Sequence, residues 1–276
     1  MNQNTSSKIS NESLSVPLGG RKLLNKVPEV MIFFWIIKIM ATTVGETAAD
    51  FLNDNLNLGL TNTTLIMSAL LLITLILQFR TSTYVPWIYW LTVVLISVVG
   101  TLITDNLTDN FGVPLQVSTM LFTILLGVSF AAWYASEKTL SIHSIFTFKR
   151  EVFYWLAILF TFALGTAAGD LIAEGLNVGY LISMLLFAVL IGCVTLAHYI
   201  FKLNAVLSFW IAYILTRPFG ASFGDFLSQP RDAGGLELGT TGTSIVFLII
   251  IVGLVIYLTK MRKLETMNLE ELWNVD

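Results

Sequence analysis

The segment VGETAADFLND at residues 44–54 decides the fold of this chain, because three related segments follow it. They read VGTLITDNLTDN at 99–110, LGTAAGDLIAEG at 164–175 and FGASFGDFLSQP at 219–230. In each copy a Trp precedes the Gly by ten residues and an Asp follows it by five, in the sets Trp35-Gly45-Asp50, Trp90-Gly100-Asp105, Trp155-Gly165-Asp170 and Trp210-Gly220-Asp225. One sequence unit has therefore been copied four times, and this periodicity predicts a repeat architecture.

The composition places these repeats in a membrane. The chain has 276 residues, of which 55% are hydrophobic and 12% charged, with a mean hydropathy of +0.79. Soluble domains carry roughly 25% charged residues. Runs of about 18 to 22 apolar residues are long enough to cross a bilayer. Eight spans are expected, near 29–50, 63–80, 85–105, 115–135, 151–171, 180–200, 205–226 and 243–260.

The loop charges predict the orientation of these spans. Alternate loops are rich in basic residues, namely Arg21, Lys22, Lys26, Arg80, Lys138, Lys149, Arg150, Lys202, Lys260, Arg262 and Lys263. The other loops, near 53–62, 106–114, 172–179 and 227–242, share a single basic residue, Arg231. Because Lys and Arg accumulate on the cytoplasmic side, both termini should be cytoplasmic in a bacterial inner (plasma) membrane.

Each repeat then forms a helical hairpin that inserts the same way up, as in transporters with parallel repeats. The expected fold is all-α, with eight transmembrane helices arranged as four parallel two-helix repeats. The first half spans 28–138 (repeats 28–84 and 85–138), and the second spans 150–260 (repeats 150–202 and 203–260). Residues 139–149 form a cytoplasmic linker, while 1–27 and 261–276 are expected to be tails, the first of them disordered.

The repeated Trp and Gly have structural explanations. Each Trp lies near the cytoplasmic start of its helix, where indole rings favour the headgroup zone, so membrane anchoring is the favoured interpretation. Glycines at matching depth allow helix backbones to approach closely, which favours packing roles for Gly45, Gly100, Gly165 and Gly220. A break in the helix is the alternative, and Pro218 favours it in the fourth copy only.

The acids are the candidate functional residues, because an ionised group in an apolar segment is costly. Helix ends facing water are the alternative explanation. In each copy a second acid or amide follows the Asp by four residues, on the same face if the helix continues. The candidate cation- or proton-binding set is Asp50, Asp105, Asp170, Asp225, Glu46, Asp54, Asp109, Glu174 and Gln229. Up to eight acids could then converge on one outward-facing funnel.

The donor chemistry narrows the ligand. Only oxygen donors cluster, and carboxylates suit Ca²⁺, Mg²⁺ or Mn²⁺, so a tentative metal set is Asp50, Asp105, Asp170 and Asp225. His143 and His198 lie away from these acids. Two candidate counter-ions lie within spans. Lys38 can extend towards the cytoplasm, whereas Arg217 is deeper and needs a carboxylate partner.

Other function classes find no support in the residues. No Walker loop, dinucleotide-binding glycine turn, HExxH motif or Ser-His-Asp order is present, so no enzyme activity and no resident cofactor is expected. The formal net charge of −3 suggests no nucleic-acid partner. The expected partners are the lipid bilayer and a small cation or solute, and the oligomeric state is open.

The four quoted segments resemble a bacterial family of uncharacterised membrane-anchored proteins over about 28–260, a resemblance that implies the repeat fold and no assigned activity. A weaker similarity is to exchangers of Mn²⁺ or Ca²⁺ for protons. The favoured function is secondary transport of a cation coupled to protons, with a divalent metal such as Mn²⁺ as the favoured cargo. The alternatives are a proton-coupled transporter of a small organic solute, or a non-transporting membrane scaffold or sensor.

Overall fold

The computed structural model describes residues 25–273, and the described part is helical without strands. Eight of its helices are long and apolar enough to cross a membrane. The odd-numbered helices are α3 (Ile32–Asp50), α5 (Pro86–Asp105), α7 (Phe148–Asp170) and α9 (Ala205–Ser228). The even-numbered helices are α4 (Leu60–Arg80), α6 (Leu115–Glu137), α8 (Tyr180–Phe201) and α10 (Thr240–Trp273). The predicted all-α class with eight spans is therefore confirmed.

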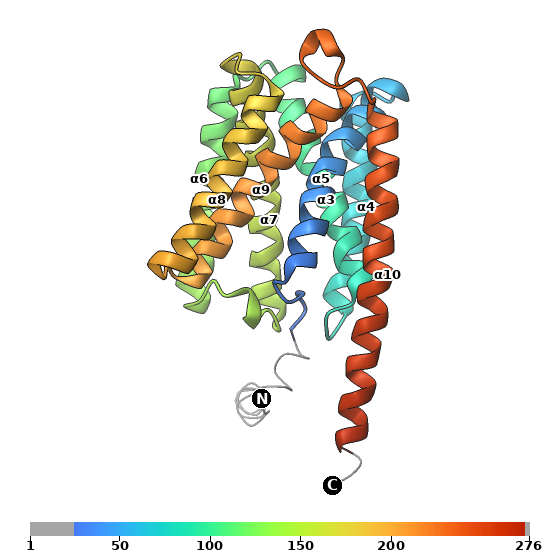
Figure 1. The fold of residues 1–276 in the computed structure, drawn as a ribbon, viewed down its shortest axis with the longest axis vertical. Coiled ribbons are helices and arrows are strands. Elements are labelled where there is room, and N and C mark those ends of the chain that lie inside the picture. Colours follow the sequence, from blue (N-terminus) through green and yellow to red (C-terminus); the bar gives the residue numbers. More distant parts are fainter. Residues whose placement is uncertain (1–24, 274–276) are drawn as a thin grey trace, which may run out of the picture.

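The helices form an inner ring and an outer ring. In the side view of Figure 1, α3, α5, α7 and α9 lie in the middle of the bundle, with α6 and α8 on one side and α4 and α10 on the other. In α3, α5, α7 and α9, between 56% and 78% of the most apolar window is buried, against 11% to 22% in the other four. The inner helices pack as a closed cycle, α3 on α5, α5 on α7, α7 on α9 and α9 on α3. The inner ring thus supplies the protein's core, and the outer ring presents its apolar side chains outwards.

Each outer helix packs mainly on the inner helix of the next repeat. The pairs are α4 with α5, α6 with α7, and α8 with α9, and α10 closes the cycle on α3. The two helices of one hairpin are joined by a short turn but share few contacts along their length. The two helices of each predicted hairpin are therefore neighbours in sequence, but each outer helix packs on the inner helix of the following repeat.

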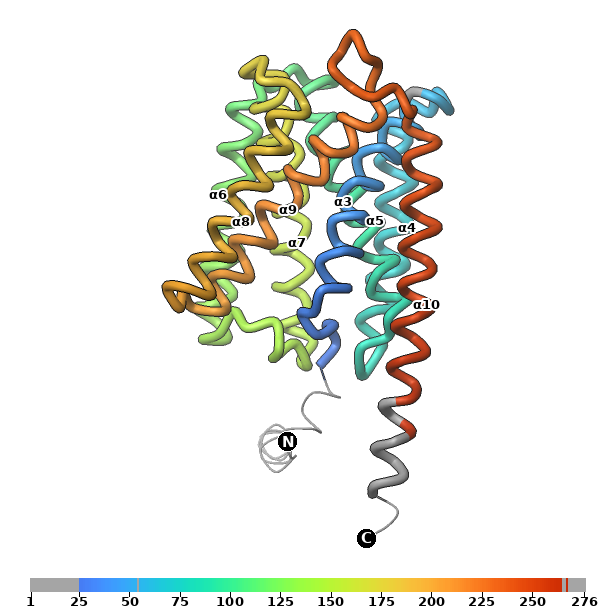
Figure 2. Tube along the Cα trace, in the orientation of Figure 1, coloured from blue at the N-terminus to red at the C-terminus, as the bar shows by residue number. Residues whose placement is uncertain are grey.

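All four inner helices run in the same direction along the bundle (Figures 1 and 2). We call the end where they begin the basic end, formed by the connections 81–85, 138–147 and 202–204. We call the opposite end, formed by the connections 56–59, 111–114, 176–179 and 229–239, the acidic end. Residues 261–273, expected to be a tail, continue α10 beyond the basic end (Figure 1).

A short segment before α3 is ordered, in contrast to the predicted disordered tail. Residues 1–24 lie outside the described part. Asn25 donates to the Ile142 carbonyl (3.1 Å) and accepts from the Ile145 amide (3.2 Å). Lys26 pairs with the buried Glu151 carboxylate at 2.7 Å. These contacts attach residues 25–27 to the connection between α6 and α7, so the tail ends earlier than expected.

The repeated Trp residues are core residues and not interface anchors. Trp90, Trp155 and Trp210 are between 1% and 4% exposed, and only Trp35 is partly exposed. Their neighbours are other aromatic rings: Tyr89 lies 5.5 Å from Trp155, centroid to centroid. The anchoring interpretation is therefore wrong for three of the four copies. At this depth, aromatic rings of neighbouring inner helices pack on one another, as Phe34 does on Trp90 and Tyr154 on Trp210.

Candidate functional site

The repeated glycines set the spacing of the inner ring. A Cβ added at Gly45 would overlap the side chain of Ser97, and one at Gly100 would overlap Phe162. The same substitution would meet Arg217 at Gly165 and Thr42 at Gly220. Each glycine therefore receives a side chain from the next repeat, and the fourth receives one from the first. The helices continue through all four positions, which agrees with packing and not with a break.

The residue after each glycine faces the middle of the ring. Glu46, Thr101 and Thr166 occupy this position in the first three copies, and the smaller Ala221 occupies it in the fourth. The guanidinium of Arg217 lies among them. Its Nη2 donates to Glu46 Oε2 at 3.0 Å, to Thr166 Oγ1 at 2.7 Å, and to Thr101 Oγ1. One Arg therefore bonds to the equivalent position of three repeats, and it is fully buried.

The structure gives Arg217 the carboxylate partner expected from the sequence. A buried ion pair needs such additional hydrogen bonds to offset the loss of water. Here two Thr hydroxyls and the Thr42 carbonyl, 3.4 Å from Nη1, supplement the Glu46 carboxylate. The two Thr hydroxyls were not among the predicted site residues. Aligning the four repeats at the residue after the glycine would have found them, because both Thr residues align there with Glu46.

Only some of the predicted acids come together in one group. One carboxylate oxygen each from Glu46, Asp170 and Asp225 lies within 4.8 Å of the other two. Glu46 and Asp225 are buried, and Asp170 is partly buried. Asp50 and Asp105 are also partly buried, but the group of three does not include them. The site is thus built from α3, α7 and α9 and is less symmetric than the fourfold repeat predicts.

The second acid of each pair lies further out. Asp109 and Glu174 are exposed, and Glu174 accepts a hydrogen bond from Tyr180 at 2.9 Å. The Asp54 side chain lies outside the described residues. In the fourth copy, Gln229 donates to Asp50 Oδ2 of the first copy at 3.5 Å. The structure therefore places Asp109 and Glu174 at the rim of the acidic end, further out than the group of Glu46, Asp170 and Asp225.

The local backbone explains this separation. The first three inner helices change from α to π geometry directly after the repeated Asp, over Phe51–Asn55, Asn106–Asn110 and Leu171–Gly175. The α-helix therefore does not continue through the acid pair, as the shared-face argument required. Such π turns are frequent at functional sites. The fourth helix stays α-helical to Ser228 and contains Pro218.

Lys38 is buried and does not extend to the membrane surface as expected. Its side chain is 0% exposed, and Nζ donates to Thr216 Oγ1 at 2.5 Å. The ammonium group lies 4.0 Å from the centroid of the Tyr213 ring and 5.3 Å from that of Phe162. Among the described residues, no carboxylate forms an ion pair with it. Lys38 is therefore not the counter-ion of an acid, in contrast to Arg217.

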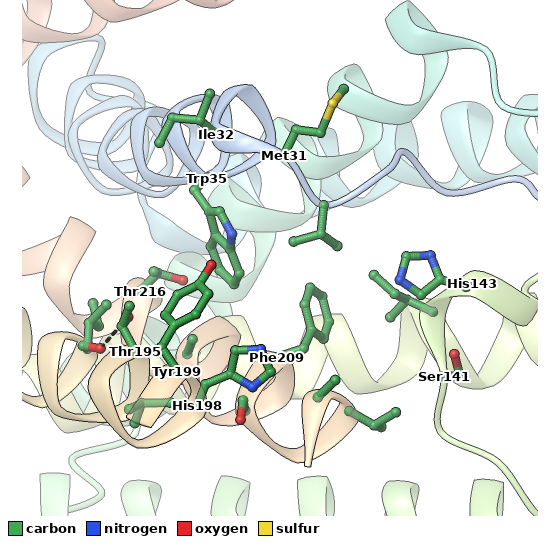
Figure 3. A pocket seen from close by; sticks show the side chains of 18 of the residues that line it. Met31, Ile32, Trp35, Ser141, His143, Thr195, His198, Tyr199, Phe209 and Thr216 are labelled. Atoms are coloured by element: carbon green, nitrogen blue, oxygen red, sulfur yellow. Dashed lines mark hydrogen bonds between the residues drawn. The ribbon is translucent and has the colours of Figure 1, made fainter. Parts of the chain in front are cut away.

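A cavity of about 630 Å³ opens between α3, α8 and α9 near the basic end (Figure 3). Trp35, Tyr199 and Phe209 contribute aromatic walls, and both histidines of the chain, His143 and His198, lie along it. Thr216, the partner of Lys38, also lines this cavity. The cavity was not predicted, because its walls come from three separate stretches of the chain, within 30–39, 140–143 and 191–216. His143 and His198 lie away from the acids, in agreement with the sequence interpretation.

Taken together, the closed ring of inner helices, its apolar outer ring and its buried charges define a multi-pass helical membrane protein built from four repeats. The family model described as Repeat of Unknown Function (DUF347) matches residues 33–84, 88–139, 153–204 and 208–263. The chain belongs to this family, and each match spans one inner helix and the outer helix that follows it. Searches of curated proteins and of solved structures found no match.

Proposed function

We propose that this protein is a secondary transporter of a divalent cation such as Mn²⁺, coupled to protons, with its basic end in the cytoplasm. The observation that carries the proposal is the convergence of Glu46, Asp170 and Asp225 from three inner helices, with ligand oxygens within 4.8 Å of one another. Three carboxylates at this separation repel one another unless a cation or a proton lies among them. Oxygen-only donor sets suit Mn²⁺, Mg²⁺ and Ca²⁺.

Arg217 can compete with the transported cation for Glu46. Its guanidinium already neutralises Glu46, which belongs to the group of three carboxylates. A divalent cation that binds Glu46 must therefore compete with a tethered cation. The proposed cycle alternates between Arg217 bound to Glu46 and metal bound to the three carboxylates. Such competition limits affinity, which suits a carrier that has to release its cargo.

Calorimetry of Mn²⁺ binding to the purified protein tests the cation site. We expect Asp170→Asn and Asp225→Asn each to weaken binding by roughly tenfold or more, because each removes one charged ligand. Asp109→Asn is the matched control, since that acid is exposed and remote from the group of three. Wild-type affinity should fall as pH falls, because protons compete for the carboxylates. Unchanged affinity in both folded variants would refute the cation site.

The cavity favours one second candidate, a proton-coupled transporter of a small organic solute. Its volume of about 630 Å³ lies in the range of small-molecule sites, and its aromatic walls suit an apolar group. In that case the acids would relay protons only. Solute uptake by proteoliposomes that depends on a proton gradient, is independent of metal, and is lost in Trp35→Ala would favour this candidate over the first.

A further inference from the structure

Lys38 lies in a setting that a permanently charged group rarely occupies. Its side chain is fully buried about two turns from the start of the membrane-spanning helix α3, and its one hydrogen-bond acceptor among the described residues is a neutral hydroxyl. The faces of two aromatic rings provide the remaining stabilisation of the ammonium form. Moving a charged group out of water without an opposite charge beside it is costly. Burial therefore favours loss of the proton from such an amine.

The charges around Lys38 oppose a second positive charge. Arg217, one turn along α9 from Tyr213, lies close enough to act on Lys38 by electrostatic repulsion. Glu46 is two turns along α3 and is already paired with Arg217. Residues 240–256 of α10 contain no ionisable group. The other inner helices also carry ionisable groups. They are Tyr213, Arg217 and Asp225 on α9, Tyr89 and Asp105 on α5, and Lys149, Arg150, Glu151, Tyr154 and Asp170 on α7.

A route for the proton leads from Lys38 to the basic end. Thr216 accepts from Lys38 and also lines the cavity, so a single hydroxyl separates the amine from that space. His198 lies along the same cavity, with its Nδ1 3.0 Å from the Leu203 carbonyl. No carboxylate is present among the described residues of the lining. The cavity therefore offers the proton a route to the basic end that does not pass the carboxylates of the proposed metal site.

We propose that Lys38 is the proton-binding residue that couples this transporter, exchanging its proton through Thr216 with the cavity at the basic end. The inference rests on the proposed function, because it assigns the coupling proton of that transport to a lysine outside the metal site. In the exchange step an N–H bond of the ammonium breaks, the electron pair stays on Nζ, and the proton passes to water in the cavity. Metal among the carboxylates and a proton on Lys38 then exclude each other by repulsion.

The first test measures protons released when Mn²⁺ binds, by calorimetry in two buffers of different ionisation enthalpy at pH 7. Wild type should release about one proton more per Mn²⁺ than Lys38→Met, which keeps the length and loses the amine. Lys38→Arg, with a fixed charge, should bind Mn²⁺ at least about tenfold more weakly than Lys38→Met. Lys149→Met, where the side chain is 63% exposed, is the control and should match wild type. Equal proton release by wild type and Lys38→Met would overturn the proposal and leave the metal site intact.

The second test needs no metal and separates this proposal from the proposed function. The difference in unfolding temperature between wild type and Lys38→Met is measured from pH 6 to pH 9. If folded Lys38 gives up its proton while the unfolded chain keeps it, the unfolded state binds more protons, so wild type gains stability relative to the variant as pH rises. A difference that stays constant would overturn proton exchange at Lys38. Absence of Mn²⁺ binding at every pH, with a rising difference, would refute only the metal cargo.

Discussion

At the scale of single residues, the two buried cations have different environments and therefore different expected roles. Arg217 makes three side-chain hydrogen bonds, one of them to a carboxylate, and its planar guanidinium stays charged in proteins. Lys38 has one hydroxyl partner and can become neutral. Arg217, which stays charged, holds the central residues of three repeats together. Lys38, in the proposal above, gains or loses its proton with the pH at the basic end.

The Arg217–Glu46 pair predicts strong coupling between two substitutions. Arg217→Met should destabilise the protein by about 3–5 kcal/mol, because it leaves Glu46 buried without its partner. Glu46→Gln should cost a similar amount, since it leaves the guanidinium without a carboxylate. The double variant should be more stable than the sum of both losses by at least about 1 kcal/mol. Unfolding in denaturing detergent measures all three, and additive losses would show that the pair contributes no mutual stabilisation.

At the scale of helices, the glycines and the π turns have complementary effects. Glycine lets a side chain of the adjacent inner helix lie against the helix backbone, which brings the following residue to the ring centre. In the first three repeats a π turn begins immediately after the repeated Asp and leads the chain towards the outer helix. In these repeats the segment between Gly and Asp is therefore fixed at both ends, and in all repeats the acids of the site lie on this segment or at its end.

The close approach predicts unequal effects of the same substitution at two glycines. Gly100→Ala should destabilise the bundle by about 1–3 kcal/mol, because its Cβ would overlap Phe162 and press on the backbone of α7. Gly127→Ala is the matched control: it lies within α6, and nothing lies within 4 Å of its added Cβ. That variant should be neutral or stabilised by up to about 1 kcal/mol through helix propensity. Thermal unfolding of both variants measures the contrast, and equal effects would contradict the packing argument.

At the scale of the whole molecule, the cyclic packing makes the bundle one cooperative unit. Every outer helix contacts the following repeat, and α10 returns to α3, so no hairpin can leave without exposing its neighbour. A shared hydrogen bond of 2.7 Å between Thr47 and Ser244 joins the first inner helix to the last outer helix. The cavity between α3, α8 and α9 lies where the first repeat meets the third and fourth, and this is where the proposed proton access is located.

The loop charges predict the orientation of this unit in the membrane. In a background without Cys193, Asp232→Cys should react with an impermeant thiol reagent added to intact cells, because the acidic end should face outwards. Lys149→Cys should react only after permeabilisation. Both side chains are exposed, so access to the reagent depends on the side of the membrane. The opposite pattern would reverse the proposed orientation and direction of proton access.

The sequence by itself determined the all-α class, the spans and the fourfold unit, because hydrophobic length and repeat spacing are local properties of the chain. It also singled out Asp170, Asp225, Glu46 and Arg217, since charges in apolar segments are unusual wherever they pack. The same reasoning misassigned the Trp residues, because position along a helix does not show which neighbour covers a ring. It could not show how far out Asp109 and Glu174 lie, because the π turns that redirect the chain after Asp105 and Asp170 do not follow from the spacing.

Only the tertiary structure decided which residues meet. Arg217 reaches Glu46 across 171 positions of sequence, and Lys38 reaches Thr216 across 178. Four similar repeats allow many pairings of this kind, and spacing along the chain does not choose among them. The choice follows from the closed ring, in which the fourth repeat packs on the first and each glycine admits a side chain from the next helix. The physical reason is that close packing depends on shape in three dimensions, whereas the sequence pattern specifies only depth along each helix.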